Sequence, residues 1–328
     1  MTPTGRRDKI ATQMRRTNRS SLANYALAIL FAASLPMRAQ SVQTDAVRGW
    51  EFAASVNLAP QDVKAEATIF IPEKVNRVRA LLVVIEYGLG FQMAASPQMA
   101  STAEALDGAV LGVQFSNVTP KVINKGLRAT NPDAVSDALA SLLPRLADET
   151  GHQELLDAPL LFWGQSAGGG AAEGFVKRFS DRILAEVLYH SGGGAGEPAK
   201  ASLQIPTLIV QGGKDTATEN LPRDFWSRGR SAGAPWTFAV EPGAAHGDLS
   251  DKVTDFMATW IQAVVLERLP TAGTTLRLVG DSSAWMGNNE TGDVAPSDNF
   301  VGSKTEASWL PDEATARAWQ SVVGAAPR

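Results

Sequence analysis

The chain has 328 residues, of which 44% are hydrophobic and 20% charged, and its formal net charge is −4. These fractions exclude a disordered chain, and its 29 glycines follow no three-residue period, which excludes a collagen. The lack of cysteine excludes a disulfide scaffold, a zinc finger and a thiol nucleophile. Because there are only three histidines, we expect no multi-histidine metal centre.

The first 39 residues have the pattern of a secretory signal peptide. Arg6, Arg7 and other basic residues precede an uncharged apolar run at 22–35, and the small residue Ala39 follows. The run is shorter than the ~20 residues that a membrane span needs. We therefore expect cleavage near Ala39 and no stable membrane anchor afterwards. A buried helix is the alternative for this run, and a start at Met14 and twin-arginine export stay open.

Removal of residues 1–39 changes the charge balance. That segment holds seven basic residues and one acidic residue, so the mature chain keeps 23 basic and 33 acidic residues and a net charge of −10. An acidic protein of this kind is not expected to bind nucleic acid. Export without cysteine is typical of a protein secreted into the bacterial periplasm or the medium.

From residue 49 the sequence alternates between β-rich apolar runs and segments with helical spacing. Residues 79–87 read RALLVVIEY, the kind of run found in a strand buried on both faces. We expect strands at 49–58, 64–71, 79–87, 109–118, 158–163, 183–190, 206–211 and 236–240, and helices at 133–149, 167–179, 250–269 and 311–323. This order predicts an α/β fold whose mostly parallel sheet is covered by helices on both faces. The main domain is expected at 40–269.

The last segment, residues 270–328, differs in composition. It is rich in Gly, Asn, Asp and Ser through 280–303, and it holds Trp285, Trp309 and Trp319. We expect a C-terminal extension whose tryptophans pack it onto the main domain. A lid or a substrate-stacking surface is the alternative.

Ser166 is the candidate nucleophile. It lies at the centre of Gly164-Gln165-Ser166-Ala167-Gly168, directly after a predicted strand and directly before a predicted helix. A serine at such a turn adopts a strained backbone, and the flanking glycines remove side chains that would clash. The turn raises the hydroxyl above the sheet edge, where a substrate can reach it.

A serine hydroxyl needs a base, and the sequence offers three histidines. His246 follows the last predicted strand in a loop of small residues, which makes it the candidate base. His190 ends a strand before a glycine triplet, so it is predicted to be a pocket-wall or structural residue or, as the alternative, the base itself. His152 is expected on the opposite edge of the sheet.

Asp215 is the candidate for the carboxylate that orients His246. It follows the strand 206–211 through two glycines, whereas Asp248 lies too near His246 in sequence to face its ring and Asp181 precedes a strand. Its task would be to fix the tautomer of His246 and to stabilise the imidazolium. Asp215 as a plain turn residue is the alternative.

The order Ser166, Asp215, His246, each after a successive strand, resembles the α/β-hydrolase superfamily over residues 49–269. The layout is similar to secreted esterases near dienelactone hydrolases, feruloyl esterases and polyhydroxybutyrate depolymerases. The resemblance implies an oxyanion hole made by the amide of Ala167 and by a second amide in Tyr87-Gly88-Leu89-Gly90, at Leu89 or a neighbour. The sequence has Tyr87-Gly88 where His-Gly is common, and we expect Tyr87, Gln165 and His190 in the substrate pocket.

The short distance between Ser166 and Asp215 in sequence leaves no room for a helical cap, so we expect an open site. An open site and an export signal favour a bulky external ester, either a small molecule or a polymer. The function expected is thus a secreted serine ester hydrolase of the carboxylesterase type that uses no metal or cofactor. A serine peptidase or amidase and a non-catalytic binding protein on the same scaffold are the alternatives.

Overall fold

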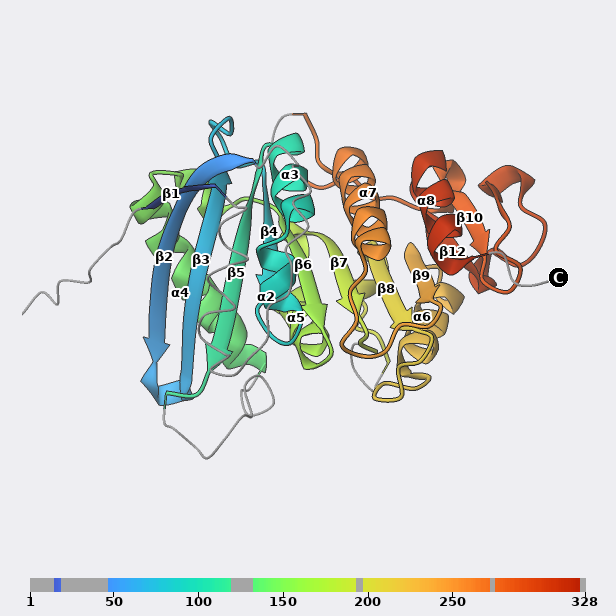
Figure 1. Cartoon of the computed structure of the whole chain (residues 1–328), viewed down its shortest axis with the longest axis horizontal. Coiled ribbons are helices and arrows are strands. Elements are labelled where there is room, and N and C mark those ends of the chain that lie inside the picture. The colour runs from blue at the N-terminus through green and yellow to red at the C-terminus, as the bar shows by residue number, and fades with distance from the viewer. Residues whose placement is uncertain (1–14, 19–46, 119–131, 193–196, 272–274, 325–328) are drawn as a thin grey trace, which may run out of the picture.

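The computed structural model describes residues 15–18, 47–118, 132–192, 197–271 and 275–324. Its centre is a nine-stranded sheet in the order β1-β2-β3-β5-β4-β6-β7-β8-β9 (Figure 1). The strands are β1 (Arg15–Asn18), β2 (Arg48–Leu58), β3 (Val63–Pro72), β4 (Ala80–Ile85), β5 (Gly108–Ser116), β6 (Leu160–Gln165), β7 (Ile183–Tyr189), β8 (Thr207–Gly212) and β9 (Trp236–Glu241).

The first strands of this sheet are antiparallel and the others are parallel. β2 and β3 form an antiparallel hairpin, and β3 pairs antiparallel with β5. From β5 to β9 every neighbouring pair is parallel. The predicted fold class is confirmed, and the eight strands predicted from residue 49 all form. Because β4, β6, β7, β8 and β9 are parallel, the loops after them open on one edge of the sheet.

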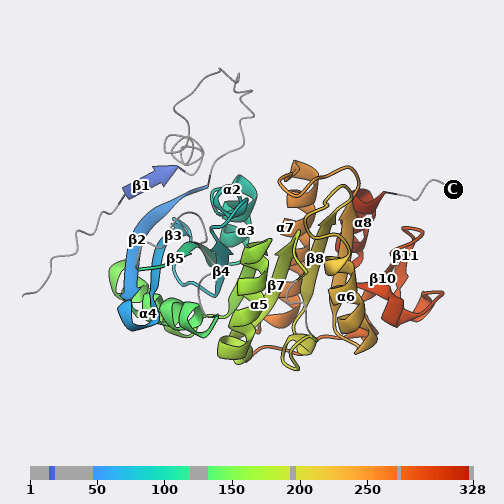
Figure 2. The same ribbon diagram turned by 90° about the horizontal axis from the view of Figure 1, so that it is seen from below.

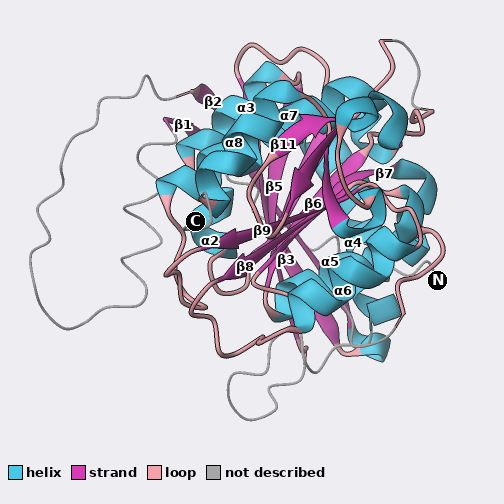
Figure 3. Ribbon diagram, turned by 90° about the vertical axis from the view of Figure 1, so that its right-hand side faces the viewer, coloured by secondary structure: helices cyan, strands magenta, loops and turns pink. Residues whose placement is uncertain are grey.

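Helices cover both faces of the sheet (Figures 2 and 3). Figure 2 shows α4 (Pro132–Thr150), α5 (Ala167–Phe179) and α6 (Leu221–Ser231) on one face. The other face carries α2 (Gly90–Ala94), α3 (Pro97–Ala105), α7 (Asp251–Arg268) and α8 (Glu313–Val323). Each face has its own apolar core, with Phe162 and Phe175 in one and Trp163 and Trp260 in the other. Strands buried on both sides explain the continuous apolar runs in the sequence.

Three helices, α2, α3 and α6, were not predicted. The sequence of α6, LPRDFWSRGRS, is polar overall, but Phe225 and Trp226 lie on one side of it and are buried. Packing against β9 provides the apolar environment that the local composition does not indicate. The helix α3 begins at Ser96, whose side chain accepts a hydrogen bond from the amide of Met99.

The C-terminal segment lies against β9 and α7. It contains α8 and a small antiparallel sheet in the order β11-β10-β12, formed by β10 (Trp285–Asn288), β11 (Val294–Pro296) and β12 (Ala307–Leu310). Trp309 and Trp319 are fully buried, and Trp285 lies under the guanidinium of Arg317. The tryptophans therefore make packing contacts, and Figure 1 shows the segment beside β9 at the end of the large sheet.

The predicted signal peptide falls largely outside the described residues. Within it, Arg15–Asn18 form β1, which pairs antiparallel with the first residues of β2. In the part of the chain that is described, no helix has the length and hydropathy needed to cross a membrane.

Candidate active site

Ser166 lies at a sharp turn between β6 and α5. Its backbone has φ 55° and ψ −121°, a region that side-chain-bearing residues rarely adopt and that indicates strain at a functional position. The tight turn requires glycine on both sides of Ser166, because a Cβ atom on Gly164 would lie 2.3 Å from the backbone oxygen of Gly168. A Cβ on Gly169 would lie 2.5 Å from the Ser191 hydroxyl. The Ser166 side chain is left half-buried at the carboxyl edge of the sheet.

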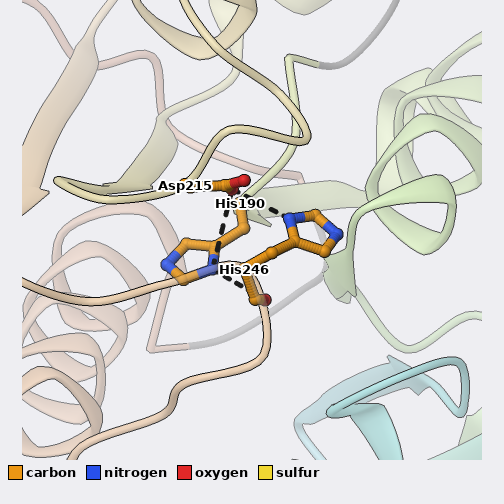
Figure 4. A group of neighbouring side chains, drawn as sticks. All are labelled: His190, Asp215 and His246. Atoms are coloured by element: carbon orange, nitrogen blue, oxygen red, sulfur yellow. Dashed lines mark hydrogen bonds and ion pairs between the residues drawn. The ribbon is translucent and has the colours of Figure 1, made fainter.

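Asp215 and His246 are brought together by the loops after β8 and β9. The Nδ1 atom of His246 lies 2.8 Å from Asp215 Oδ2 (Figure 4). The Asp215 carboxylate is fully buried, whereas the His246 side chain keeps 31% of its surface exposed. With Nδ1 directed at the carboxylate, Nε2 is the ring atom left to exchange a proton with a hydroxyl.

The carboxylate of Asp215 is held in its ionised form. Burial by itself would raise its pKa, but hydrogen bonds from His246, Thr218 and the amide of Ala217 outweigh burial and lower the pKa. The Thr218 hydroxyl donates to Oδ2 at 2.8 Å, and the Ala217 amide donates to Oδ1 at 2.8 Å. The sequence analysis missed Thr218, although Asp-x-x-Thr after a strand is a pattern typical of such a turn.

The two loops are also joined through their backbones. The amide of Gly213 donates to Glu241 O, and that of Lys214 donates to Ala244 O, each at 2.8 Å. A Cβ on Gly212 would lie 2.5 Å from Ala244 O, so the glycines after β8 allow this close approach. The Asp215–His246 pair is therefore fixed by main-chain contacts as well as by its own hydrogen bond.

Gln165 links the sharp turn at Ser166 to two other loops. Its side chain is 3% exposed, its Nε2 donates to the backbone oxygen of His246 at 2.8 Å, and its Oε1 accepts from the Leu89 amide at 3.2 Å. The β4–α2 turn fits closely around it, because a Cβ on Gly88 would lie 2.0 Å from that Oε1. Although we predicted Gln165 in the substrate pocket, its buried side chain lies behind the surface that a substrate would meet.

His190 is the second histidine of the site. It is fully buried, it stacks on Tyr189, and its Nδ1 donates to the backbone oxygen of His246 at 3.0 Å (Figure 4). The same nitrogen is 3.9 Å from Asp215 Oδ2, farther than the His246 nitrogen. Burial lowers the pKa of His190 and favours the neutral ring. His190 therefore supports the His246 loop from beneath, which fits the structural role among our predictions and not a position in the pocket wall.

The predicted oxyanion donors differ in availability. Ala167 is the first residue of α5, and its amide donates to no acceptor within the described residues. The Leu89 amide, in contrast, is engaged by Gln165. One residue earlier, the amide of exposed Gly88 has no acceptor in the described part of the chain. The β4–α2 turn thus offers Gly88 directly, and Leu89 only after Gln165 moves.

The remaining candidate residues have structural contacts. Half-buried Tyr87 lies beside the turn that carries Ser166, since a Cβ atom added to Gly168 would be 3.6 Å from the Cβ atom of Tyr87. Asp248 accepts from the Ala245 amide at 2.8 Å and so closes the histidine loop. His152 pairs with Glu154 before β6, at the other edge of the sheet, as we expected.

Side-chain ligand atoms of His190, Asp215 and His246 lie within 4.8 Å of one another, a spacing compatible with a metal ion. Each histidine, however, already uses Nδ1 in a hydrogen bond that holds this cluster together. The arrangement fits a hydrogen-bonded acid–base pair better than a set of metal ligands, which would present unprotonated nitrogens.

Comparison with known proteins gives structural likeness only. No protein-family model matches the chain, and no curated protein matches it. A dienelactone hydrolase from Anabaena variabilis is 18% identical with a TM-score of 0.47, over 68% of this chain and 99% of that chain. A serine hydrolase without a lid from Xanthomonas campestris is 15% identical with a TM-score of 0.46, over 67% and 97%. An arylesterase is 13% identical with a TM-score of 0.48, over 75% and 97%.

These likenesses are distant. The fold class is instead defined by the strand order and by the sharp turn that carries Ser166. A mostly parallel sheet in the order β2-β3-β5-β4-β6-β7-β8-β9, with a strained serine between β6 and α5, is the α/β-hydrolase fold.

Proposed function

We propose that this protein is a serine hydrolase that cleaves carboxylic esters through an acyl-enzyme. One observation carries the proposal: the strained Ser166 lies at the same sheet edge as a His246 ring whose Nδ1 is 2.8 Å from a buried carboxylate. The hydrogen bond from the Gln165 side-chain amide to the backbone oxygen of His246 joins the segments that carry the two groups. Nucleophile, base and orienting acid are the parts that such catalysis requires.

The mechanism follows from the roles that the geometry allows. Ser166 Oγ attacks the ester carbonyl carbon while His246 Nε2 accepts its proton, and Asp215 stabilises the resulting imidazolium. The Ala167 amide and one amide of the Gly88–Leu89 turn hold the oxyanion. His246 then protonates the departing alcohol. Water, activated by the same histidine, releases the acid and restores Ser166.

An open site supports a bulky ester. Between Ser166 and Asp215 the described residues form α5, β7, β8 and the short turns Ser180–Arg182 and Ser202–Gln204, and none of these is a helical cap. A substrate that extends beyond the site, such as an acylated sugar or a polyester, fits such an edge. We therefore propose a bulky ester of this kind as the substrate.

The first test is covalent labelling by a fluorophosphonate. The protein should label, and Ser166→Ala should not. A short nitrophenyl ester should be hydrolysed, with Ser166→Ala and His246→Ala each lowering kcat by at least ~10⁴-fold while the circular dichroism spectrum stays unchanged. Absence of labelling would reject both the esterase and the peptidase. Preferential cleavage of an aminoacyl anilide would favour the peptidase.

We also propose that the enzyme is exported after cleavage near Ala39. The support is the basic and apolar pattern of residues 1–39. Expression in a bacterial host followed by N-terminal sequencing of the periplasmic fraction tests this. An intact N-terminus in the cytoplasm would contradict it.

A further inference from the structure

A cavity of about 1000 Å³ lies at the edge of the sheet opposite to Ser166. Its wall includes the residues that precede β4, β6, β7 and β8, together with the end of α7. The nucleophile follows the other end of β6. A six-residue strand at about 3.3 Å per residue separates the two by roughly 20 Å. The cavity is therefore distinct from the proposed active site.

Four arginines line this cavity, namely Arg77, Arg79, Arg182 and Arg268. Within the described residues, three of them donate hydrogen bonds to backbone oxygens: Arg79 to Pro270 O at 2.8 Å, Arg182 to Ala158 O at 2.7 Å, and Arg268 to Ile183 O at 2.8 Å. Within the described residues, none of the four lies within ion-pair distance of a carboxylate.

These carbonyl contacts leave donors unused. A guanidinium has five N–H groups, and Arg182 uses only Nε and Nη2 in the described part of the chain. Arg268 uses only Nε and Nη1 there, although the whole residue is 4% exposed. A buried cation without an anionic partner is costly. Burial lowers the pKa of Arg182, and it lowers that of Arg268 to about 10, although the nearby carboxylates of Asp157 and Glu267 respectively act in the opposite direction.

The acidic residues at the wall only partly offset this charge. Glu154 is occupied by the Val78 amide at 2.7 Å and by His152 at 2.8 Å. Asp157 and Asp181 are both exposed, where water screens them. The inner wall is thus positive and the outer wall mixed.

We propose that this cavity binds an organic anion, with its oxyanion head among the four arginines and its apolar body along the end of α7. The apolar body would contact Leu269 and Leu276 in the same wall, and Leu278, which is 75% exposed, lines the cavity as well. Guanidinium groups suit the planar, two-point binding of carboxylates and phosphates. A volume near 1000 Å³ can hold a ligand of drug-like size.

Calorimetry on the full chain with Ser166→Ala tests this proposal without relying on hydrolysis. The probes are 4-phenylbutyrate and phenyl phosphate, with 4-phenylbutan-1-ol and inorganic phosphate as matched compounds that lack the charge or the apolar body. At least one organic anion should bind, and both matched compounds should bind at least ~10-fold more weakly. The stronger of the two anions identifies the head group as carboxylate or phosphate ester.

Variants locate the binding. Arg77→Gln removes an exposed guanidinium that makes no hydrogen bond or ion pair within the described residues, and it should weaken anion binding about 10-fold. Arg182→Lys keeps the charge but loses the planar fork, and it should also weaken binding. Arg178→Gln, on the exposed side of α5, is the control and should change nothing. The proposal is overturned if neither anion binds at concentrations on the order of 10 mM, if the neutral alcohol binds equally well, or if Arg77→Gln and Arg178→Gln behave alike.

Discussion

The side-chain amide of Gln165 joins three segments of the candidate site: the β4–α2 turn, the His246 loop and the turn that carries Ser166. Its oxygen faces the β4–α2 turn and its nitrogen faces the histidine loop, while its own backbone precedes the nucleophile. Because the side chain is buried, it would act by positioning His246 rather than by touching substrate. Displacements of about 1 Å at such a site cost on the order of 10²-fold in rate.

Substitution of Gln165 should therefore lower kcat and leave KM nearly unchanged. Gln165→Met should reduce kcat by about 10–100-fold at every pH. Gln165→Glu can still accept from Leu89, but once ionised it repels the His246 carbonyl. Its kcat, divided by that of the wild type, should fall as the pH rises and recover when the carboxyl is protonated.

The control for this series is Gln114→Glu, at an exposed position of β5. Rates on a nitrophenyl ester, measured between about pH 5 and 9, supply the comparison. Equal pH profiles for Gln165→Glu and Gln165→Met would show that Gln165 only fills space. If the wild type hydrolyses nothing, the rate of fluorophosphonate labelling provides the same comparison.

Glu186 on β7 makes stability depend on pH. Burial raises its pKa from 4.5 to about 8, with a contribution from Glu173 on α5. The folded chain thus keeps a proton that the unfolded chain loses above its own pKa. The stability contribution is full below about pH 4.5, and it decreases as the pH rises towards 8.

Glu186→Gln removes this dependence. Relative to the wild type, the variant should gain stability between about pH 5 and 8, by an order of a few kcal/mol at the upper end. Urea unfolding at several pH values measures the difference, and Glu290→Gln at an exposed position serves as the control. A constant difference between Glu186→Gln and wild type across this range would contradict the prediction.

At the scale of elements, β12 covers the last edge of the large sheet with side chains. The Phe238 amide of β9 donates to Ser308 Oγ at 2.8 Å, and the same hydroxyl donates back to Phe238 O at 2.9 Å. Trp319 of α8 donates to that oxygen at 2.7 Å. These groups satisfy part of an edge that would otherwise be open to another strand.

Ser308→Ala should therefore destabilise the protein. It leaves the buried amide of Phe238 without its acceptor, at a cost of about 1–3 kcal/mol. Ser321→Ala, which removes an exposed hydroxyl from α8, should change the free energy of unfolding by less than about 0.5 kcal/mol. Urea denaturation compares the two, and equal effects would mean that Ser308 does not satisfy the edge.

At the scale of the whole molecule, the C-terminal segment is held by a buried charge. Arg230 of α6 is fully buried, and it donates to Ala307 O at 2.8 Å and lies 3.3 Å from Asp281. It also binds the backbone oxygen of Lys304. The segment thereby connects to α6 as well as to β9 and α7.

Truncation after Leu269 should remove this cover and cause association. The edge of β9, the side of α7 that packs against α8, and the buried guanidinium of Arg230 would all lose the contacts that this segment supplies. Size-exclusion chromatography should show aggregates or loss of soluble protein, whereas truncation after Gly324, which keeps α8, should leave the elution unchanged. A soluble, monomeric 1–269 chain would contradict the prediction.

The strands of the parallel sheet, the sharp turn at Ser166 and the three candidate catalytic residues could be predicted from the amino-acid sequence. These depend on local signals: continuous apolar runs, glycines around a strained turn, and polar residues that directly follow strands. The same reasoning did not find α6, whose apolar face is a minority of its residues, or Thr218, whose hydroxyl reaches Asp215 only once the turn between them has folded.

The surroundings of the candidate residues, in contrast, depend on contacts between segments that are remote in sequence. Gln165 and His190 lie beneath the His246 loop, and the Leu89 amide donates a hydrogen bond to Gln165. These contacts form because the loops after β4, β6, β7 and β9 converge at one edge of the sheet. The arginine cavity likewise joins residues as distant in sequence as Arg77 and Arg268. Side-chain burial and hydrogen-bond partners depend on contacts between remote segments, and local pattern carries no information on those contacts.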